Sequence, residues 1–125
     1  MATYEFHHIH HETTDVDATA AFYQKNFDAQ LTERIERDGV QWARLTIGGV
    51  SLNVTDRGKL DVPLGVIHGL DHFCLRTSDF NETIAALKAN GVHFFTEPMS
   101  PKPGTHIAFV SGPDNMKIEI LQISG

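Results

Sequence analysis

The chain has 125 residues, of which 41% are hydrophobic and 21% charged, a composition typical of one globular domain with its own core. The net charge of −6 arises from 16 acidic and 10 basic residues, and no basic cluster favours nucleic acid as a partner. Cys74 is the single cysteine, which excludes a disulfide within the chain and fits a reducing compartment. The N-terminus lacks a signal-like apolar run, and no stretch approaches the roughly 20 apolar residues that span a bilayer. We therefore expect a cytoplasmic protein without a membrane partner.

The first half of the chain is predicted to be a strand, a helix and three more strands. Residues 4–12 form the strand candidate, and Asp15 can cap a helix that runs to about residue 26. The helix has one apolar face, made of Val16, Ala20, Tyr23 and Phe27. The three strands are expected at residues 30–36, 40–47 and 50–56. Two hairpin signals connect them, Asp38-Gly39 and Gly48-Gly49.

The second half repeats this order after a linker. Residues 57–69 contain Gly58, Pro63, Gly65 and Gly69. We expect them to join two halves of a single domain, with module one at about 4–56 and module two at about 70–123. In module two, residues 70–77 form the strand, Asp79 caps the helix, and Glu82 occupies the capping-box position. The apolar face of this helix is Phe80, Ile84 and Leu87, and the stop signal is Asn90-Gly91.

Three strands are again expected after the helix, at residues 92–95, 106–110 and 116–123. Asp114-Asn115 supplies the last turn. The segment 96–104 contains Pro98, Pro101 and Pro103, and is predicted to be a stiffened loop at the rim of a pocket.

The repeat is visible in the residues themselves. The two copies read HIHHETTDV and HFCLRTSDF, the first beginning at His8 and the second at His72. His8 precedes Asp15 by seven positions, and His72 precedes Asp79 by the same number. A duplicated frame brings His8, His72 and Glu119 from distant parts of the sequence to matching places. Two histidines and one carboxylate make a suitable site for a divalent metal ion, and three protein ligands leave positions open for substrate.

Three segments match a known family pattern in order and at the right spacing: HHIHHETTDVDATAAFYQKNF, GLDHFCLRTSDF and GPDNMKIEIL. Over nearly its whole length the chain resembles the vicinal oxygen chelate superfamily, also called the glyoxalase/bleomycin resistance protein/dioxygenase family. The resemblance implies an α+β fold in which two β-α-β-β-β modules form an incomplete barrel around a metal pocket. It also implies four ligand positions: His8, Asn53, His72 and Glu119. Many relatives have Glu or Gln where this chain has Asn53, so the expected ligands are His8, His72 and Glu119.

The metal ion could be iron, manganese, zinc, nickel or cobalt in the divalent state. It would serve lyase or isomerase chemistry as a Lewis acid, or iron-dependent dioxygenation. Strand alternation names further pocket residues, because every second side chain shares a face. His10 or Glu12 is the candidate general base. The candidate substrate contacts are Cys74 and Arg76 by this alternation, Asn53 by its place among the family's ligand positions, and His106 because it follows the proline-rich segment 96–104. Each of these side chains has a simpler interpretation as pocket lining or surface charge. The simpler interpretation of Glu119 is a solvated glutamate on an outer face, whereas the family resemblance favours the barrel interior.

The sequence is compatible with four functions. A metal-dependent lyase, isomerase or epimerase is the first, although Asn53 removes the carboxylate that many such relatives use for proton transfer. An iron dioxygenase is the second. The third is a resistance enzyme that opens a metal-bound antibiotic epoxide, and the fourth is a drug-binding module without metal or turnover. In each case the partner is a small molecule. A homodimer is also expected, in which His8 could meet His72 and Glu119 of a second copy.

Overall fold

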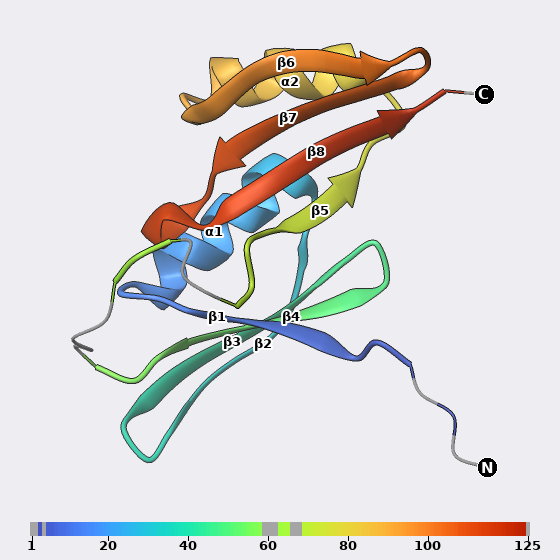
Figure 1. Cartoon of the computed structure of the whole chain (residues 1–125). Coiled ribbons are helices and arrows are strands. Elements are labelled where there is room, and N and C mark those ends of the chain that lie inside the picture. Colours follow the sequence, from blue (N-terminus) through green and yellow to red (C-terminus); the bar gives the residue numbers. More distant parts are fainter. Residues whose placement is uncertain (1–2, 4, 59–62, 66–68, 125) are drawn as a thin grey trace. The chain divides into compact units, whose positions relative to one another are not determined.

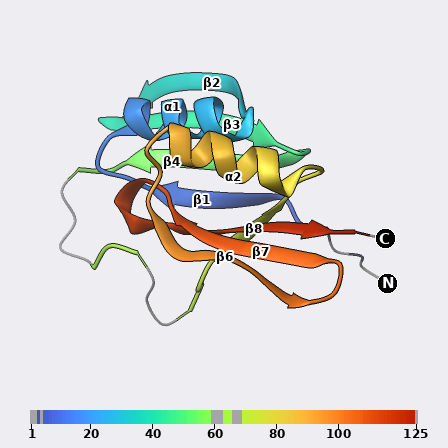
Figure 2. The ribbon, with the colours of Figure 1, turned by 90° about the horizontal axis from the view of Figure 1, so that it is seen from above.

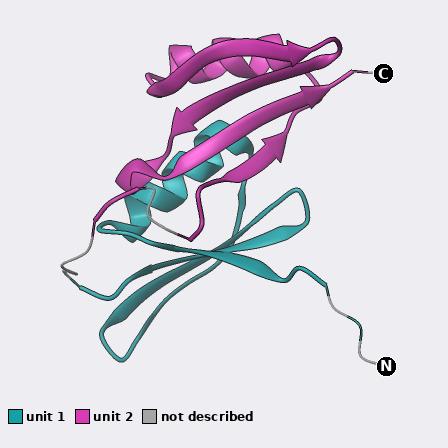
Figure 3. Cartoon of the chain, in the orientation of Figure 1, with its two compact units in different colours: residues 1–61 teal, residues 62–125 magenta. Residues whose placement is uncertain are grey.

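The computed structural model describes residue 3 and residues 5–58, 63–65 and 69–124. The chain divides into two compact units, 1–61 and 62–125, each with a four-stranded sheet and one α-helix (Figures 1 and 3). This is the expected α+β pair of β-α-β-β-β modules, and the sheets are not closed into a barrel. Parts of two predicted segments lie outside the described residues. They are Tyr4 in the first predicted strand and residues 59–62 and 66–68, which include His68, in the predicted linker. None of the described helices is long and apolar enough to cross a membrane.

The first unit contains a sheet with the strand order β1-β4-β3-β2. Its elements are β1 (His8–Glu12), α1 (Val16–Phe27), β2 (Gln30–Arg37), β3 (Val40–Ile47) and β4 (Val50–Asp56). β1 pairs with β4 in parallel, and the other pairs are antiparallel. Both predicted hairpins are present, since Asp38, Gly39, Gly48 and Gly49 all adopt positive φ as a two-residue hairpin turn requires. α1 packs on β2, β3 and β4, on one face of this sheet (Figure 2).

The second unit repeats this topology with the strand order β5-β8-β7-β6. Its elements are β5 (Phe73–Arg76), α2 (Phe80–Ala89), β6 (Phe94–Lys102), β7 (Thr105–Ser111), a 3-10 turn η1 (Pro113–Asn115) and β8 (Lys117–Ile123). β5 pairs with β8 in parallel, as β1 does with β4. Asp114 and Asn115 adopt positive φ in the predicted last turn.

The predicted loop over residues 96–104 is wrong, because most of it belongs to β6. β6 runs on to Lys102 and carries Pro98 and Pro101 within it. β6 is an edge strand, and its pairing with β7 shifts register at three places. An edge strand with bulges tolerates proline, because the missing N–H need not pair with a neighbour. The true turn is the two-residue connection Pro103-Gly104 between the paired residues Lys102 and Thr105.

The same hydrogen bonds start both helices. Asp15 accepts from the backbone N–H of Ala18 at 3.0 Å, and Asp79 accepts from that of Glu82 at the same distance. Two residues before each cap, the hydroxyls of Thr13 and Thr77 hydrogen-bond those of Thr19 and Thr83 inside the helices, each at 2.7 Å. The predicted caps are therefore confirmed, and the duplication extends to side-chain contacts that hold strand and helix together.

Each sheet has one face covered by its helix and one face that carries polar side chains. In the first unit the covered face contains buried Ala43, Leu45, Leu52 and Val54. In the second it contains buried Ala108, Val110, Ile118 and Ile120. Because side chains alternate along a strand, Asn53 and Glu119 leave their sheets on the opposite, polar faces.

Candidate functional site

Strand register shows that Asn53 and Glu119 hold equivalent places in the two units. In the first unit His10 pairs with Asn53, and in the second Cys74 pairs with Glu119. His10 and Cys74 themselves hold the same place in the repeat, since each is the third residue of its copy. The first unit thus has an amide at the position where the second has a carboxylate.

The second unit brings His72 and Glu119 into direct contact. Nε2 of His72 lies 2.9 Å from Oε1 of Glu119, and Nδ1 lies 2.7 Å from Oδ2 of Asp71. Phe109, the pairing neighbour of Glu119 on β7, meets the His72 ring edge to face at 5.2 Å. Hydrogen bonds from His72 and Lys117 hold the pKa of Asp71 below its ordinary value. The imidazole is therefore held between two carboxyl groups.

This donor set fits a divalent metal ion. Two ligand atoms each about 2.1 Å from one ion, at a right angle, lie about 3.0 Å apart, close to the observed 2.9 Å. A neutral imidazole has one N–H and can donate to only one of the two carboxyl groups that it faces. A cation beside Nε2 and Glu119 would satisfy the remaining nitrogen and oxygen together.

His8, the third expected ligand, belongs to the other unit. Its side chain is exposed at the start of β1, and its Nδ1 lies 2.9 Å from Nδ1 of His7. Within the described residues no group of three or more His, Cys, Asp or Glu side chains is placed to hold a metal ion. Two of the three predicted ligands, His72 and Glu119, are thus in contact inside one unit, and metal ligation by all three stays a prediction.

A second polar cluster lies on the polar face of the first unit's sheet, opposite to the face that α1 covers. The Thr55 hydroxyl donates to Oε1 of Glu12 at 2.5 Å and lies 2.6 Å from Nε2 of His10. Arg57 also contacts Glu12, through its backbone N–H at 2.8 Å and through Nε at 3.2 Å. Trp42 flanks the His10 ring at 5.9 Å between ring centroids. Both oxygens of Glu12 are therefore engaged.

These contacts determine where His10 carries its proton. Thr55 has one hydroxyl proton, and it goes to Glu12, so Nε2–H of His10 must donate to the Thr55 oxygen. The lone pair of the neutral ring is then on Nδ1. Burial, followed by the charge of Arg57, lowers the pKa of His10 below its ordinary value of 6.5. His10 is accordingly neutral at pH 7 and able to accept a proton.

The remaining candidates are distributed over the second sheet. Cys74 shares the face of Glu119, and burial, with the nearby charge of Glu119, raises the pKa of its thiol to about 11. Arg76 lies two residues further along β5 and donates to the backbone oxygen of Ile123 at 3.3 Å. His106 pairs with Gln122 and contacts the ring of Phe80 in α2. It therefore lies on the helix-covered face, opposite to Glu119.

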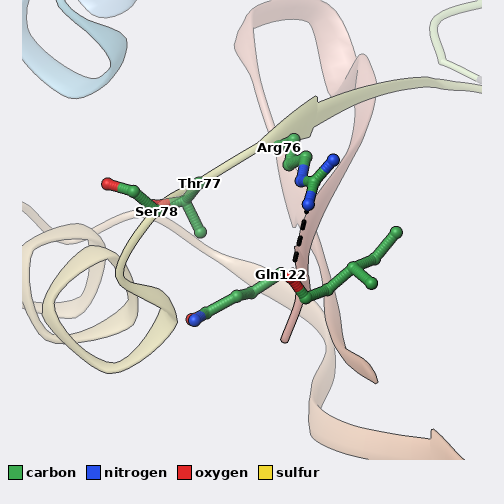
Figure 4. Close-up of a pocket in the computed structure, with 5 residues that line it drawn as sticks. Arg76, Thr77, Ser78 and Gln122 are labelled. Carbon is green, nitrogen blue, oxygen red and sulfur yellow. Dashed lines mark hydrogen bonds between the residues drawn. The ribbon is translucent and has the colours of Figure 1, made fainter. Parts of the chain in front are cut away.

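A pocket of about 350 Å³ opens where β5 ends and α2 begins (Figure 4). It is lined by Arg76, Thr77, Ser78, Gln122 and Ile123. Figure 4 shows the Arg76 guanidinium directed at the end of β8, where it donates to the backbone oxygen of Ile123. Neither His72 nor Glu119 lines this pocket.

Sequence reasoning missed two residues that contact the candidates. Asp71 directly precedes His72, and its adjacency to a candidate ligand was the signal available. Thr55 lies two residues after Asn53, so strand alternation alone places it on the same face. Its contact with His10 depends on the parallel pairing of β1 and β4, which the sequence did not define.

The model of the Glyoxalase/Bleomycin resistance protein/Dioxygenase superfamily matches residues 5–120. The chain belongs to this superfamily. It is 31% identical over 116 residues to a probable lactoylglutathione lyase of Vibrio parahaemolyticus, covering 86% of this chain and 83% of that protein. It is 28% identical to a lactoylglutathione lyase of Arabidopsis thaliana over 94% of this chain, but it spans only 44% of that longer protein.

Solved structures of the superfamily share the fold. A glyoxylase/bleomycin resistance protein/dioxygenase domain from Frankia matches with a TM-score of 0.83 at 20% identity, covering 98% of this chain and 99% of that one. A mutant of the fosfomycin resistance protein FosX of Listeria monocytogenes matches with a TM-score of 0.76 at 18% identity, covering 95% of this chain and 92% of that one. That FosX structure contains Mn(II) and 1S,2S-dihydroxypropylphosphonic acid.

Proposed function

We propose that this chain is a divalent-metal-dependent enzyme of the glyoxalase type, with lyase or isomerase activity on a small substrate that offers two adjacent oxygen atoms. The observation that carries the proposal is the 2.9 Å approach of His72 Nε2 to Glu119 Oε1. The relatives named as lactoylglutathione lyases support the reaction class. His72 and Glu119, with His8, would hold the ion, which could be iron, manganese, zinc, nickel or cobalt. When bound, it supplies a Lewis acid for an oxyanion.

The chain's own residues would provide proton transfer and substrate contacts. His10 would accept the proton at Nδ1, because its Nε2 is committed to Thr55. Glu12 would orient Thr55, and through Thr55 the ring of His10, because both of its own oxygens are already engaged. Asn53 and Cys74, which pair with His10 and Glu119, would contact the substrate. Arg76 would offer a planar fork to an anionic group at the far end of β5.

Metal content tests the proposal. Protein purified without a histidine-affinity column and reconstituted with each candidate ion should bind about one equivalent per site. His72→Ala should lose both the metal and the activity. His106→Ala is the matched control, because His106 lies on the opposite face of the same sheet and should keep both. Substoichiometric metal in the parent protein after reconstitution, or full metal in His72→Ala, would show that the site is wrongly assigned.

A second candidate is the opening of a metal-bound antibiotic epoxide. It is favoured by Asn53, because the first unit lacks the carboxylate that Glu119 provides in the second. Assays of lactoylglutathione formation, and of fosfomycin consumption with Mn(II), distinguish the two reactions. Oxygen uptake with Fe(II) would instead indicate a dioxygenase.

We also propose that two copies associate, with His8 of one copy completing the site of the other. Light scattering at the concentration of the activity assay tests this association. A monomeric mass in a fully active sample would refute it.

A further inference from the structure

Each of the two candidate ligand histidines has its Nδ1 occupied by the residue that precedes it. His72 Nδ1 lies 2.7 Å from Asp71 Oδ2, and His8 Nδ1 lies 2.9 Å from His7 Nδ1. Asp71 and His7 directly precede the first histidine of each copy, so they hold the same place in the repeat. The two halves thus use the same position for different chemistry, a carboxylate behind His72 and an imidazole behind His8.

We propose that Asp71 is a positioning residue that selects Nε2 of His72 as the metal-binding nitrogen and strengthens its bond to the ion. This inference rests on the proposed metal site. A carboxylate can only accept a hydrogen bond, so the partner nitrogen Nδ1 must carry the proton. The lone pair of a singly protonated ring then lies on Nε2, the nitrogen that faces Glu119. A carboxylate behind a ligand histidine also fixes the ring orientation and raises its basicity as a ligand.

Lys117 opposes this effect. Its ammonium lies 3.3 Å from the same Asp71 oxygen that His72 contacts, and 4.8 Å from the centre of the Phe109 ring. The ammonium draws charge from the carboxylate and adds a positive charge near the ion. Removing Lys117 should therefore tighten metal binding, whereas removing the Asp71 charge should weaken it.

The two units consequently differ in what lies beside each candidate histidine. His72 has an anionic partner, while His8 has the imidazole of His7, which offers no negative charge. The second unit, with His72, Glu119 and Asp71, should supply most of the affinity for the ion.

The test is the affinity of the full chain for Zn²⁺, measured by competition with a chromophoric chelator. Asp71→Asn removes the charge at constant shape and should weaken Zn²⁺ binding by about 10- to 100-fold, the usual effect of losing such a partner. Lys117→Met should bind Zn²⁺ more tightly than the parent. His7→Asn, the matched control at the equivalent position, should lose less affinity than Asp71→Asn. The Asp71 side chain is 55% exposed, so the variant should fold, which circular dichroism would verify.

The outcomes separate this inference from the proposed function. Unchanged affinity in folded Asp71→Asn, while His72→Ala abolishes binding, would overturn the role of Asp71 and leave the metal site intact. Weaker binding in both Asp71→Asn and Lys117→Met would also overturn it, because a purely structural network would be damaged by either change. Absence of Zn²⁺ binding by the parent chain would overturn both.

Discussion

Thr55 offers a sharp test of the polar cluster on the first unit, because one buried hydroxyl links two candidate catalytic side chains. Thr55 is fully buried, and its Oγ1 bonds His10 Nε2 at 2.6 Å and Glu12 Oε1 at 2.5 Å. Thr55→Val removes both bonds at nearly constant volume. If the Thr55 hydroxyl made neither bond in the parent protein, the substitution would be neutral or stabilising, since valine is the more apolar side chain.

The expected loss of stability follows from the two hydrogen-bond partners of Thr55, one of which is charged. A hydrogen bond to a charged group contributes about 1.5–3 kcal/mol and a neutral one about 0.5–1.5 kcal/mol. The side chains of His10 and Glu12 are each 28% exposed, so water replaces part of what is lost. We therefore expect Thr55→Val to reduce the free energy of unfolding by about 2 kcal/mol. Thr55→Ser keeps the hydroxyl and removes one buried methyl group, which should cost about 1 kcal/mol.

Urea denaturation provides the assay. Trp42 is the only tryptophan, and its ring lies beside His10, so its fluorescence reports on the first unit. The ¹⁵N shift of His10 Nε2 provides an independent readout, since loss of the hydrogen bond to Thr55 should change this shift in Thr55→Val much more than in Thr55→Ser. The reasoning is refuted if Thr55→Val is as stable as Thr55→Ser or more so, and the Nε2 shift of His10 is the same in both variants.

Two further predictions concern the second unit. The pKa of about 11 at Cys74, against an ordinary value of 9.0, leaves about 100-fold less thiolate near pH 8. The greater nucleophilicity of a more basic thiolate offsets about 10-fold of this, so alkylation by iodoacetamide should be about 10-fold slower than for an unperturbed thiol, as followed by mass spectrometry. Burial is the main cause of this raised pKa and the charge of Glu119 the second, so Glu119→Gln should speed the reaction in part. Equal rates in both proteins would contradict the contribution of Glu119. Leu87 is 1% exposed in α2, so Leu87→Ala should cost about 2–5 kcal/mol in urea denaturation. Leu64, which is 58% exposed, is the control, and a similar loss in Leu64→Ala would show that burial does not determine the cost of the substitution.

Local signals predicted most of the secondary structure correctly. Asp15 and Asp79 cap the helices as expected, because a short acidic side chain can satisfy a free backbone N–H without tertiary help. The Gly48-Gly49 turn is formed for an equally local reason, since both residues must adopt positive φ. The strands before the two helices begin later than expected, at His8 and Phe73. Strand ends depend on where a neighbouring strand is available to pair, and composition does not show that.

The wrong prediction of a loop over Pro98 and Pro101, where β6 runs instead, has a similar cause. Proline argues against a central strand, and the sequence did not show that β6 would lie at a sheet edge. The expected role of His106 depended on the same segment. Its position on the helix-covered face follows from the pairing of β7 with β8, which places it opposite Gln122.

The sequence by itself determined the duplicated frame and the chemistry available within it. The constant offset of the repeat matched His8 with His72, and the two aspartates that follow them marked the start of each helix. These features are visible because periodicity and capping act over a few residues. Only the tertiary structure decided that Nε2 of His72 meets Glu119 while Nδ1 meets Asp71, and that Thr55 holds His10. The contacts with Glu119 and Thr55 depend on the register of parallel strands that lie at opposite ends of each unit's sequence, and no local pattern records that register.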